Sequence, residues 1–378
     1  MLIVATICGI GLIATVLWEA FETIVLPRRV TRRFRLTRFF YRTTWSAWSK
    51  VVDAVVPARW QDTWLSIFGP LSILLLLAIW AFGMVFGFAL LHWAAGSAAD
   101  VHGGGNGFLT DLYLSGTTFF TLGIGDVVPL SSTARVLVVI QSGLGLGFFA
   151  LVIAYLPPLN QSFARREVSI SLLDARAGSP PTAAEMLRRN GHEGGMEALR
   201  QLLWEWEQWS AEFLEGHLSY PILAYFRSQH DNESWLAALT AILDSCALVM
   251  VGPESLCQRQ AGLTFSMARH AIVDLCVIFR TAPCQSEYDR LPPEKQAQLR
   301  TVLATAGIKL DDGEATNLRL RDLRQTYEPY LHALATYFQI SIPPWVDAQR
   351  RPDNWQGNVR TPQAAMEEVH RPKRGGHF

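Results

Sequence analysis

The sequence predicts an all-α membrane protein, and three features of the chain support this fold class. Residues 65–91 and 134–159 are long apolar stretches, and residues 2–17 form a third. Residues 65–134 contain no Lys or Arg, whereas residues 27–64 contain eight Arg and one Lys. A bilayer imposes such segregation, because a charge at its centre costs several kcal/mol. No β-rich run interrupts the pattern.

The first span is predicted within residues 1–26. A helix needs roughly 20 apolar residues to cross the hydrocarbon core, so Glu19 and Glu22 would lie near the interface. The competing interpretation is a secretory signal peptide. The segment lacks a basic n-region and an A-x-A-like cleavage site, so we predict an uncleaved helix.

The second and third spans enclose the centre of the chain. Trp64 and Trp93 bracket the second span as interfacial aromatic residues. Cytoplasmic loops are enriched in Lys and Arg, which orients the chain. Residues 27–64 and everything after the third span are then cytoplasmic. The N-terminus and residues 92–133 face outward, and the expected location is the cell inner membrane.

The basic segment at residues 27–64 allows two interpretations. Four arginines recur at every third position, as in a voltage-sensing helix: Arg29, Arg32, Arg35 and Arg38. Further arginines lie on other faces, and the run is outside any apolar span. An interfacial amphipathic helix is therefore the favoured prediction. Glu19 and Glu22 are expected to pair with an arginine at position 28 or 29, with a proton- or lipid-sensitive latch as the alternative.

Between the second and third spans lies a segment that is too short to cross the membrane. A Gly-rich connection at residues 102–107 precedes an apolar stretch of about three helical turns at residues 109–120. The sequence T-L-G-I-G-D follows at residues 121–126. Irregular backbone at membrane depth is tolerated only where protein or a water-filled cavity satisfies it. We therefore predict a re-entrant loop.

The residue types of this loop suit a dehydrated cation. Rings of backbone carbonyls can replace the hydration shell of K⁺. To aim successive carbonyls at one axis, the backbone must alternate between ordinary and left-handed dihedral angles, which Gly123 and Gly125 permit at little steric cost. Thr121 can add a side-chain oxygen, and Asp126 adds a carboxylate at the outer mouth. One chain supplies one column of carbonyls, so four chains must surround the axis.

These residues carry a family resemblance. The sequence T-T-F-F-T-L-G-I-G-D at residues 117–126, between two spans, resembles the pore loop of the potassium-channel superfamily, whose usual filter is T-V-G-Y-G-D. The resemblance covers residues 65–159. It implies a homotetrameric channel with K⁺ as the permeant ion and membrane lipid as its surroundings. It also implies five filter residues per chain: Thr121, Leu122, Gly123, Ile124 and Gly125.

The resemblance implies support for the filter from the preceding helix, by Thr117, Thr118 and Tyr113. One departure bears on selectivity, because Ile124 replaces the customary Tyr or Phe. The hydrogen bond that a Tyr hydroxyl could make to the pore helix is absent. A weakly selective cation channel is therefore the alternative within this class. A membrane-anchored signalling or scaffold protein whose loop does not conduct is the alternative outside it.

The third span contains three alternate glycines that allow two interpretations: Gly143, Gly145 and Gly147. They can form the hinge of an inner gate, or they can let helices pack closely. The pair Pro157 and Pro158 is expected to end or kink the helix. His92, at the outer end of the second span, is expected to be an ordinary interfacial residue, with external pH sensing as the alternative.

The remaining half of the chain is predicted as an all-α cytoplasmic domain over residues 160–343. Helical spacing marks four segments: residues 197–216, 234–251, 262–279 and 311–340. The balance of 33 basic and 33 acidic residues indicates no partner class, and no nucleic-acid partner is predicted. We find no nucleophile–base constellation, cofactor motif or metal spacing, so an enzyme is not expected. Residues 344–378 are Pro-, Arg- and Gly-rich and are predicted to be disordered.

Overall fold

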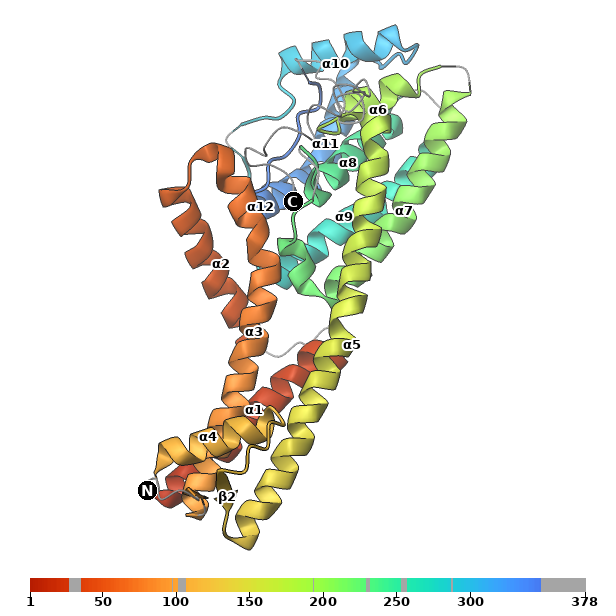
Figure 1. Cartoon of the computed structure of the whole chain (residues 1–378). Coiled ribbons are helices and arrows are strands. Elements are labelled where there is room, and N and C mark those ends of the chain that lie inside the picture. The colour runs from red at the N-terminus through yellow and green to blue at the C-terminus, as the bar shows by residue number, and fades with distance from the viewer. Residues whose placement is uncertain are drawn as a thin grey trace, which may run out of the picture. The chain divides into compact units, whose positions relative to one another are not determined.

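The computed structural model describes residues 1–26, 35–96, 98–100, 107–192, 194–228, 232–252, 257–286 and 288–347 (Figure 1). The chain divides into two compact units. Unit 1 comprises the described residues of Met1–Ser162 and Leu218–Phe226, and unit 2 comprises those of Phe163–His217 and Arg227–Phe378. The described elements are helices apart from one two-stranded antiparallel pair. The predicted all-α membrane fold is confirmed.

Unit 1 contains the T-L-G-I-G-D segment and the elements around it. Its elements are α1 Leu2–Ala20, the π-helical turn η1 Phe21–Val25, α2 Leu36–Val55, α3 Ala58–Ala95, β1 Ala98–Asp100, α4 Phe108–Phe119, β2 Val127–Pro129, the first part of α5 Ser132–Ala177, and the 3-10 turn η2 Pro221–Tyr225.

Among the residues that the structure describes, four helical segments are long and apolar enough to cross a membrane: Leu2–Val25, Ala58–Ala95, Ser132–Ala177 and Gln258–Phe279. The first three contain the predicted spans. The fourth is α9, which lies in unit 2 and was expected as a helix of the cytoplasmic domain. Its buried residues include Asp274 and Thr264.

Helices α1 and α3 meet through glycines. A Cβ atom at Gly9 would lie 2.8 Å from the Gly87 carbonyl oxygen, and one at Gly87 would lie 2.7 Å from Ile13 Cγ1. Small residues such as these glycines let the backbones of membrane helices approach one another closely. Around the contact, one apolar cluster joins α1, α3 and the end of α4: Ile13, Val16, Ala20, Leu76, Trp80, Met84, Val85, Phe88 and Phe119. The first span is thereby packed on the second.

The third span does not end at its two prolines. We expected Pro157 and Pro158 to end or kink the helix, but α5 continues through both prolines to Ala177, so the predicted end is wrong and a kink stays a prediction. A proline lacks the N–H that bonds to the carbonyl four residues earlier, so two prolines cost the helix two bonds. The turns on either side keep theirs, and unit 1 gives way to unit 2 within this continuous helix.

The inner end of α1 holds the start of α2. Glu19 is 2% exposed and accepts hydrogen bonds from Leu36 N at 3.2 Å, Thr37 N at 3.0 Å and Thr37 Oγ1 at 2.8 Å. A carboxylate from another helix thus takes the place of an N-cap side chain. Glu22 accepts from Trp18 Nε1 at 2.8 Å and lies 3.8 Å from Arg35. The arginines at 28, 29 and 32 lie outside the described residues.

The segment 218–226 belongs to unit 1, although the chain on both sides of it belongs to unit 2. The Tyr225 ring lies 5.3 Å from Trp45 of α2 and 5.3 Å from Phe68 of α3. A Cβ atom at Gly69 would lie 2.8 Å from the Phe226 ring, so a larger residue here would force the ring to shift. The sequence did not predict that a turn from the second half of the chain would pack between α2 and α3.

Unit 2 is a helical bundle around the buried helix α8. Its elements are the rest of α5, α6 Ala183–Arg189, α7 Gly195–Ser219, α8 Trp235–Val251, α9 Gln258–Phe279, α10 Pro293–Thr305, α11 Glu314–Gln325 and α12 Glu328–Phe338. The predicted helix 311–340 is two helices, because the chain restarts at Glu328 with Pro329 at the position where a helix tolerates proline. Trp345 is 0% exposed, so ordered structure continues past the predicted boundary at residue 343 to the last described residue, 347.

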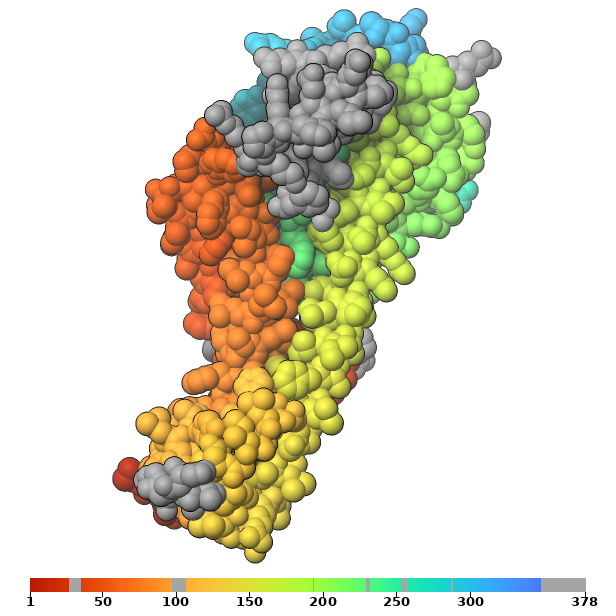
Figure 2. Space-filling model, viewed as in Figure 1, coloured from red at the N-terminus to blue at the C-terminus, as the bar shows by residue number. Residues whose placement is uncertain are grey.

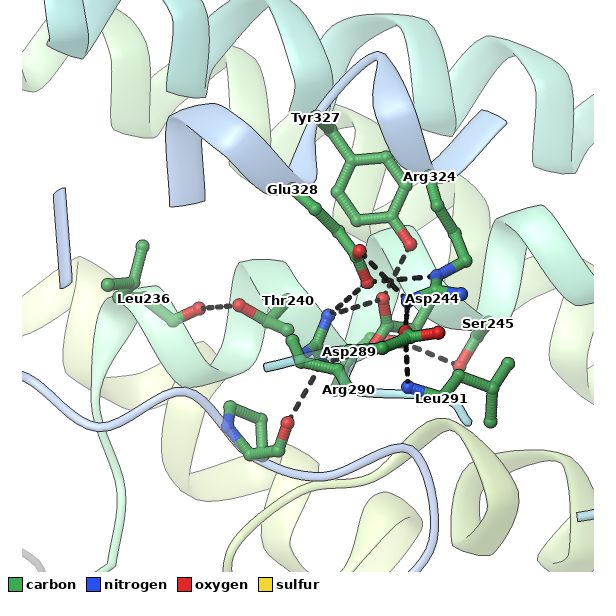
Figure 3. A network of polar contacts seen from close by, with 12 residues as sticks. Leu236, Thr240, Asp244, Ser245, Asp289, Arg290, Leu291, Arg324, Tyr327 and Glu328 are labelled. Carbon is green, nitrogen blue, oxygen red and sulfur yellow. Dashed lines mark hydrogen bonds and ion pairs between the residues drawn. The ribbon is translucent and has the colours of Figure 1, made fainter. Parts of the chain in front are cut away.

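A buried charge network holds three parts of unit 2 together (Figure 3). Arg290 Nη2 donates to Asp244 Oδ2 at 2.6 Å, and Arg290 Nη1 donates to Glu328 Oε1 at 2.9 Å. The Tyr327 hydroxyl donates to Asp244 Oδ1 at 2.6 Å. Burial raises the pKa of Asp244, and Arg290 opposes that shift. Asp244 is thus paired inside the bundle, as a buried charge requires.

Candidate ion pathway

The end of α4 fixes where the T-L-G-I-G-D segment begins. After Phe119 the helix ends, and the Leu122 N–H donates to the Thr117 carbonyl at 2.8 Å. The Thr121 N–H donates to the Thr118 carbonyl at 3.0 Å. The two threonines that sequence reasoning placed behind the filter therefore contact it through their backbone carbonyls. The contact depends on the last turn of α4 being intact.

The backbone of this segment alternates in handedness. Thr121, Gly123 and Gly125 have positive φ angles of 55°, 57° and 83°, whereas the intervening Leu122 and Ile124 do not. The alternation expected at the two glycines is present, and Thr121 extends it by one residue. A positive φ is uncommon for a threonine, so its surroundings must hold it there. Alternating dihedral angles of this kind turn successive carbonyls toward the same side of the chain.

The same segment is open to solvent in a single chain. Residues 121–125 are all exposed, with Leu122 at 63% and Ile124 at 60%. In Figure 2 the gold and yellow part of the surface, which includes α4 and the start of α5, faces the viewer. At membrane depth, the polar groups of an irregular backbone need partners from protein or from a water-filled cavity.

Asp126 is tied back to the pore helix. The Tyr113 hydroxyl donates to Asp126 Oδ2 at 2.9 Å, and Val127 N donates to Asp126 Oδ1 at 3.0 Å. Beyond it, β2 pairs with β1 in an antiparallel register that places Val128 opposite Ala99. The structure thus brings together Tyr113 and Asp126, which the sequence had assigned to different roles. The predicted Gly-rich connection lies outside the described residues except for Gly107.

The three glycines of α5 separate into two kinds. A Cβ atom at Gly145 would lie 2.2 Å from the Phe119 carbonyl oxygen, so this glycine lets α5 touch the end of α4. At Gly143 and Gly147 a Cβ atom would meet nothing within 4 Å, and both residues are exposed. The packing interpretation therefore fits Gly145. The hinge interpretation stays a prediction for the other two.

Sequence reasoning missed the residues that join α5 to α4. Gln141 is fully buried and donates to Ser115, and the Phe119 ring lies 5.6 Å from Phe148. An available signal was the amide itself, because a polar side chain within an apolar span is costly unless it has partners. His92 was expected at an interface but is 0% exposed and lies 3.2 Å from Gln141.

A metal centre is not formed by the part of the chain that the structure describes, where no three His, Cys, Asp or Glu side chains converge. The five cysteines, all within the described residues, form no disulfide: Cys8 and Cys284 are exposed, and Cys246, Cys257 and Cys276 are buried.

One comparison with known proteins bears on this site. The family model described as "Ion channel" matches residues 74–157. The match covers most of α3, all of α4, the T-L-G-I-G-D segment and α5 as far as Pro157. No curated protein and no solved structure matches the chain.

Proposed function

We propose that the ion-channel domain at residues 74–157 forms, from four copies of this chain, a pore that conducts K⁺ passively across the membrane. The observation that carries the proposal is the alternation of positive and negative φ from Thr121 to Gly125. Carbonyl oxygens aligned in this way can replace the hydration shell of K⁺. Thr121, Leu122, Gly123, Ile124 and Gly125 would then form the ion-binding filter.

The exposure of the filter supports assembly around an axis. A cage of carbonyls needs oxygens on all sides of the ion, and four pore loops supply them in potassium channels. Copies of the chain would cover the apolar side chains of Leu122 and Ile124, which are more than half exposed in one chain. The exposed faces of Gly143 and Gly147 on α5 would then border the inner part of the pore, where a hinge would act.

Selectivity for K⁺ depends on how rigidly the filter is held. Ile124 cannot donate a side-chain hydrogen bond, so the filter must be held by other contacts. The bond from Tyr113 to Asp126 and the bonds from residues 121 and 122 to α4 are such contacts. If they do not suffice, the pore is a weakly selective cation channel, which the flux experiment below distinguishes.

The proposed orientation follows from the basic residues. The segment containing α2 and the chain beyond the third span would face the cytoplasm, and the loop carrying Asp126 would face outward. An inner-membrane location and a non-enzymatic role complete the proposal. Unit 2 would then be a cytoplasmic module attached directly to the pore-lining helix α5.

Reconstituted ion flux tests the proposal. We expect the purified protein in liposomes to pass K⁺ much faster than Na⁺ and to be blocked by Ba²⁺. Gly123→Ala should abolish flux, because Gly123 has φ +57°. Gly262→Ala, in α9 with ordinary φ and open space, is the matched control and should conduct normally. Equal K⁺ and Na⁺ flux would refute selectivity, and a folded tetramer without flux would refute conduction.

A further inference from the structure

A buried polar network behind the candidate filter joins three helices of unit 1. His92 on α3, Ser115 on α4 and Gln141 on α5 are each 0% exposed. Polar side chains at membrane depth are costly unless they bond to one another or to backbone. The network is therefore a specific connection between helices and not a by-product of their packing.

The hydrogen bonds fix which way the Gln141 amide points. Its Nε2 lies 2.8 Å from the Ser115 carbonyl oxygen and 2.6 Å from Ser115 Oγ. A carbonyl oxygen only accepts, so this end must be the NH₂ group, and Oε1 faces His92 Nε2 at 3.2 Å. His92 Nε2 then donates to Gln141, and Ser115 Oγ donates onward to the Val85 carbonyl at 2.6 Å. Both ends of the amide are engaged.

The network acts on the same turn of α4 that holds the filter. Ser115 is followed two and three residues later by Thr117 and Thr118, whose carbonyls accept the N–H groups of residues 122 and 121. Gly145 lies one turn beyond Gln141 on α5, and Phe119 lies one turn beyond Ser115 on α4. Gly145 packs on the Phe119 carbonyl. Helices α5 and α4 therefore meet at two successive turns. A shift of α5 at this contact would displace the start of the filter.

We propose that Gln141 is a positioning residue of the pore: it holds α5 in register with α4 and so keeps the filter backbone in its conducting geometry. The inference rests on the proposed function. The side-chain type matters, because the amide donates to Ser115 through Nε2 and accepts from His92 through Oε1. An ionised glutamate has the same shape but would set an acceptor against the Ser115 carbonyl. Methionine fills similar space without either bond.

Permeability ratios in planar bilayers test this role. Gln141→Met should lower the K⁺-to-Na⁺ ratio about fivefold, the change that loss of one net hydrogen bond produces in an equilibrium, and Gln141→Glu should lower it further. Ser115→Ala should lower it less, because the Ser115 carbonyl remains. Gln141→Met combined with Ser115→Ala should lower the ratio by less than the two single losses together, since the two side chains share a contact. Gln201→Met on the exposed face of α7 makes the same chemical change and should leave the ratio unaltered.

The outcomes separate this inference from the proposed function. If the wild-type chain conducts selectively and Gln141→Met keeps its ratio, the inference is overturned and the channel proposal stands. Additive losses in the double variant also overturn it. A wild-type chain that folds as a tetramer and passes no ion overturns both. If Gln141→Met does not fold, Ser115→Ala decides alone, because it removes a single hydroxyl, and an unchanged ratio there counts against the inference.

Discussion

The Tyr113 hydroxyl donates a 2.9 Å hydrogen bond to Asp126 Oδ2, which ties the residue after the filter to the helix before it. Both ends of the T-L-G-I-G-D segment are thus anchored on α4: the inner end by backbone bonds to the carbonyls of Thr117 and Thr118, the outer end by this side-chain bond. With isoleucine at position 124, we expect the Tyr113 bond to hold the outer half of the loop.

Removing the Tyr113 hydroxyl should therefore destabilise the conducting state. We expect Tyr113→Phe to pass K⁺ but to lose conduction several-fold faster during a sustained pulse, because bonds to a charged group are stronger than ordinary ones. Single-channel recording measures this rate. Tyr288→Phe removes a hydroxyl from a side chain that is 66% exposed and should change nothing. An unaltered rate in Tyr113→Phe would show that the bond does not support the filter.

A methyl group at Gly145 should break the contact between α5 and α4. The added Cβ would lie 2.2 Å from a backbone oxygen, which cannot move aside as a flexible side chain can. Overpacking typically costs about 1–3 kcal/mol, so Gly145→Ala should lower the unfolding temperature and the yield of assembled protein. Gly147→Ala, two residues away in open space, is the control. Equal thermal stability of the two variants would contradict the packing role.

The carboxylate of Glu19 should stabilise the start of α2. It accepts hydrogen bonds from the first two backbone N–H groups of that helix. Loss of an N-cap costs about 0.5–2 kcal/mol of stability. Glu19→Ala should therefore increase amide hydrogen exchange in the first turn of α2 while leaving unit 2 unchanged. Glu215→Ala changes an exposed glutamate of α7 and serves as the control. Normal protection at residues 36–39 in Glu19→Ala would refute the capping role.

Unit 2 should lose stability in acid because of His217. The side chain is 1% exposed, its Nδ1 donates to the Phe213 carbonyl at 2.7 Å, and burial together with Arg166 lowers its pKa to about 3. Unfolded, it titrates near pH 6.5. Below that pH the unfolded chain binds a proton that the folded chain does not, so the free energy of unfolding should fall by up to ~1.4 kcal/mol per pH unit down to about pH 3.

The variant His217→Phe should flatten this pH dependence, since it cannot bind a proton. Denaturant unfolding monitored by helix content between pH 7 and pH 4 measures the slope. His192→Phe, at an exposed position, should keep the wild-type slope. Parallel slopes for wild type and His217→Phe would show that other groups cause the acid sensitivity.

The sequence predicted the elements whose signals are local. Apolar length predicted the three spanning helices, and alternate glycines predicted the positive φ angles at Gly123 and Gly125. Relationships between distant residues were not predictable, because they depend on which helix faces meet. Gln141 and Ser115 are 26 residues apart, and Glu19 caps a helix that begins 17 residues later. The continuation of α5 through Pro157 was also missed, since local breaking signals were outweighed by the turns on both sides.

In the proposed channel, four copies of residues 121–125 enclose K⁺ in backbone carbonyls. A density map of the protein in a lipid nanodisc, recorded in K⁺ or in its heavier analogue Rb⁺, tests it most directly. We predict a four-fold axis with a column of ion density between rings of oxygens from Thr121 to Gly125. A well-ordered assembly in which these segments do not face a common axis, or face one that carries no ion density, would contradict it.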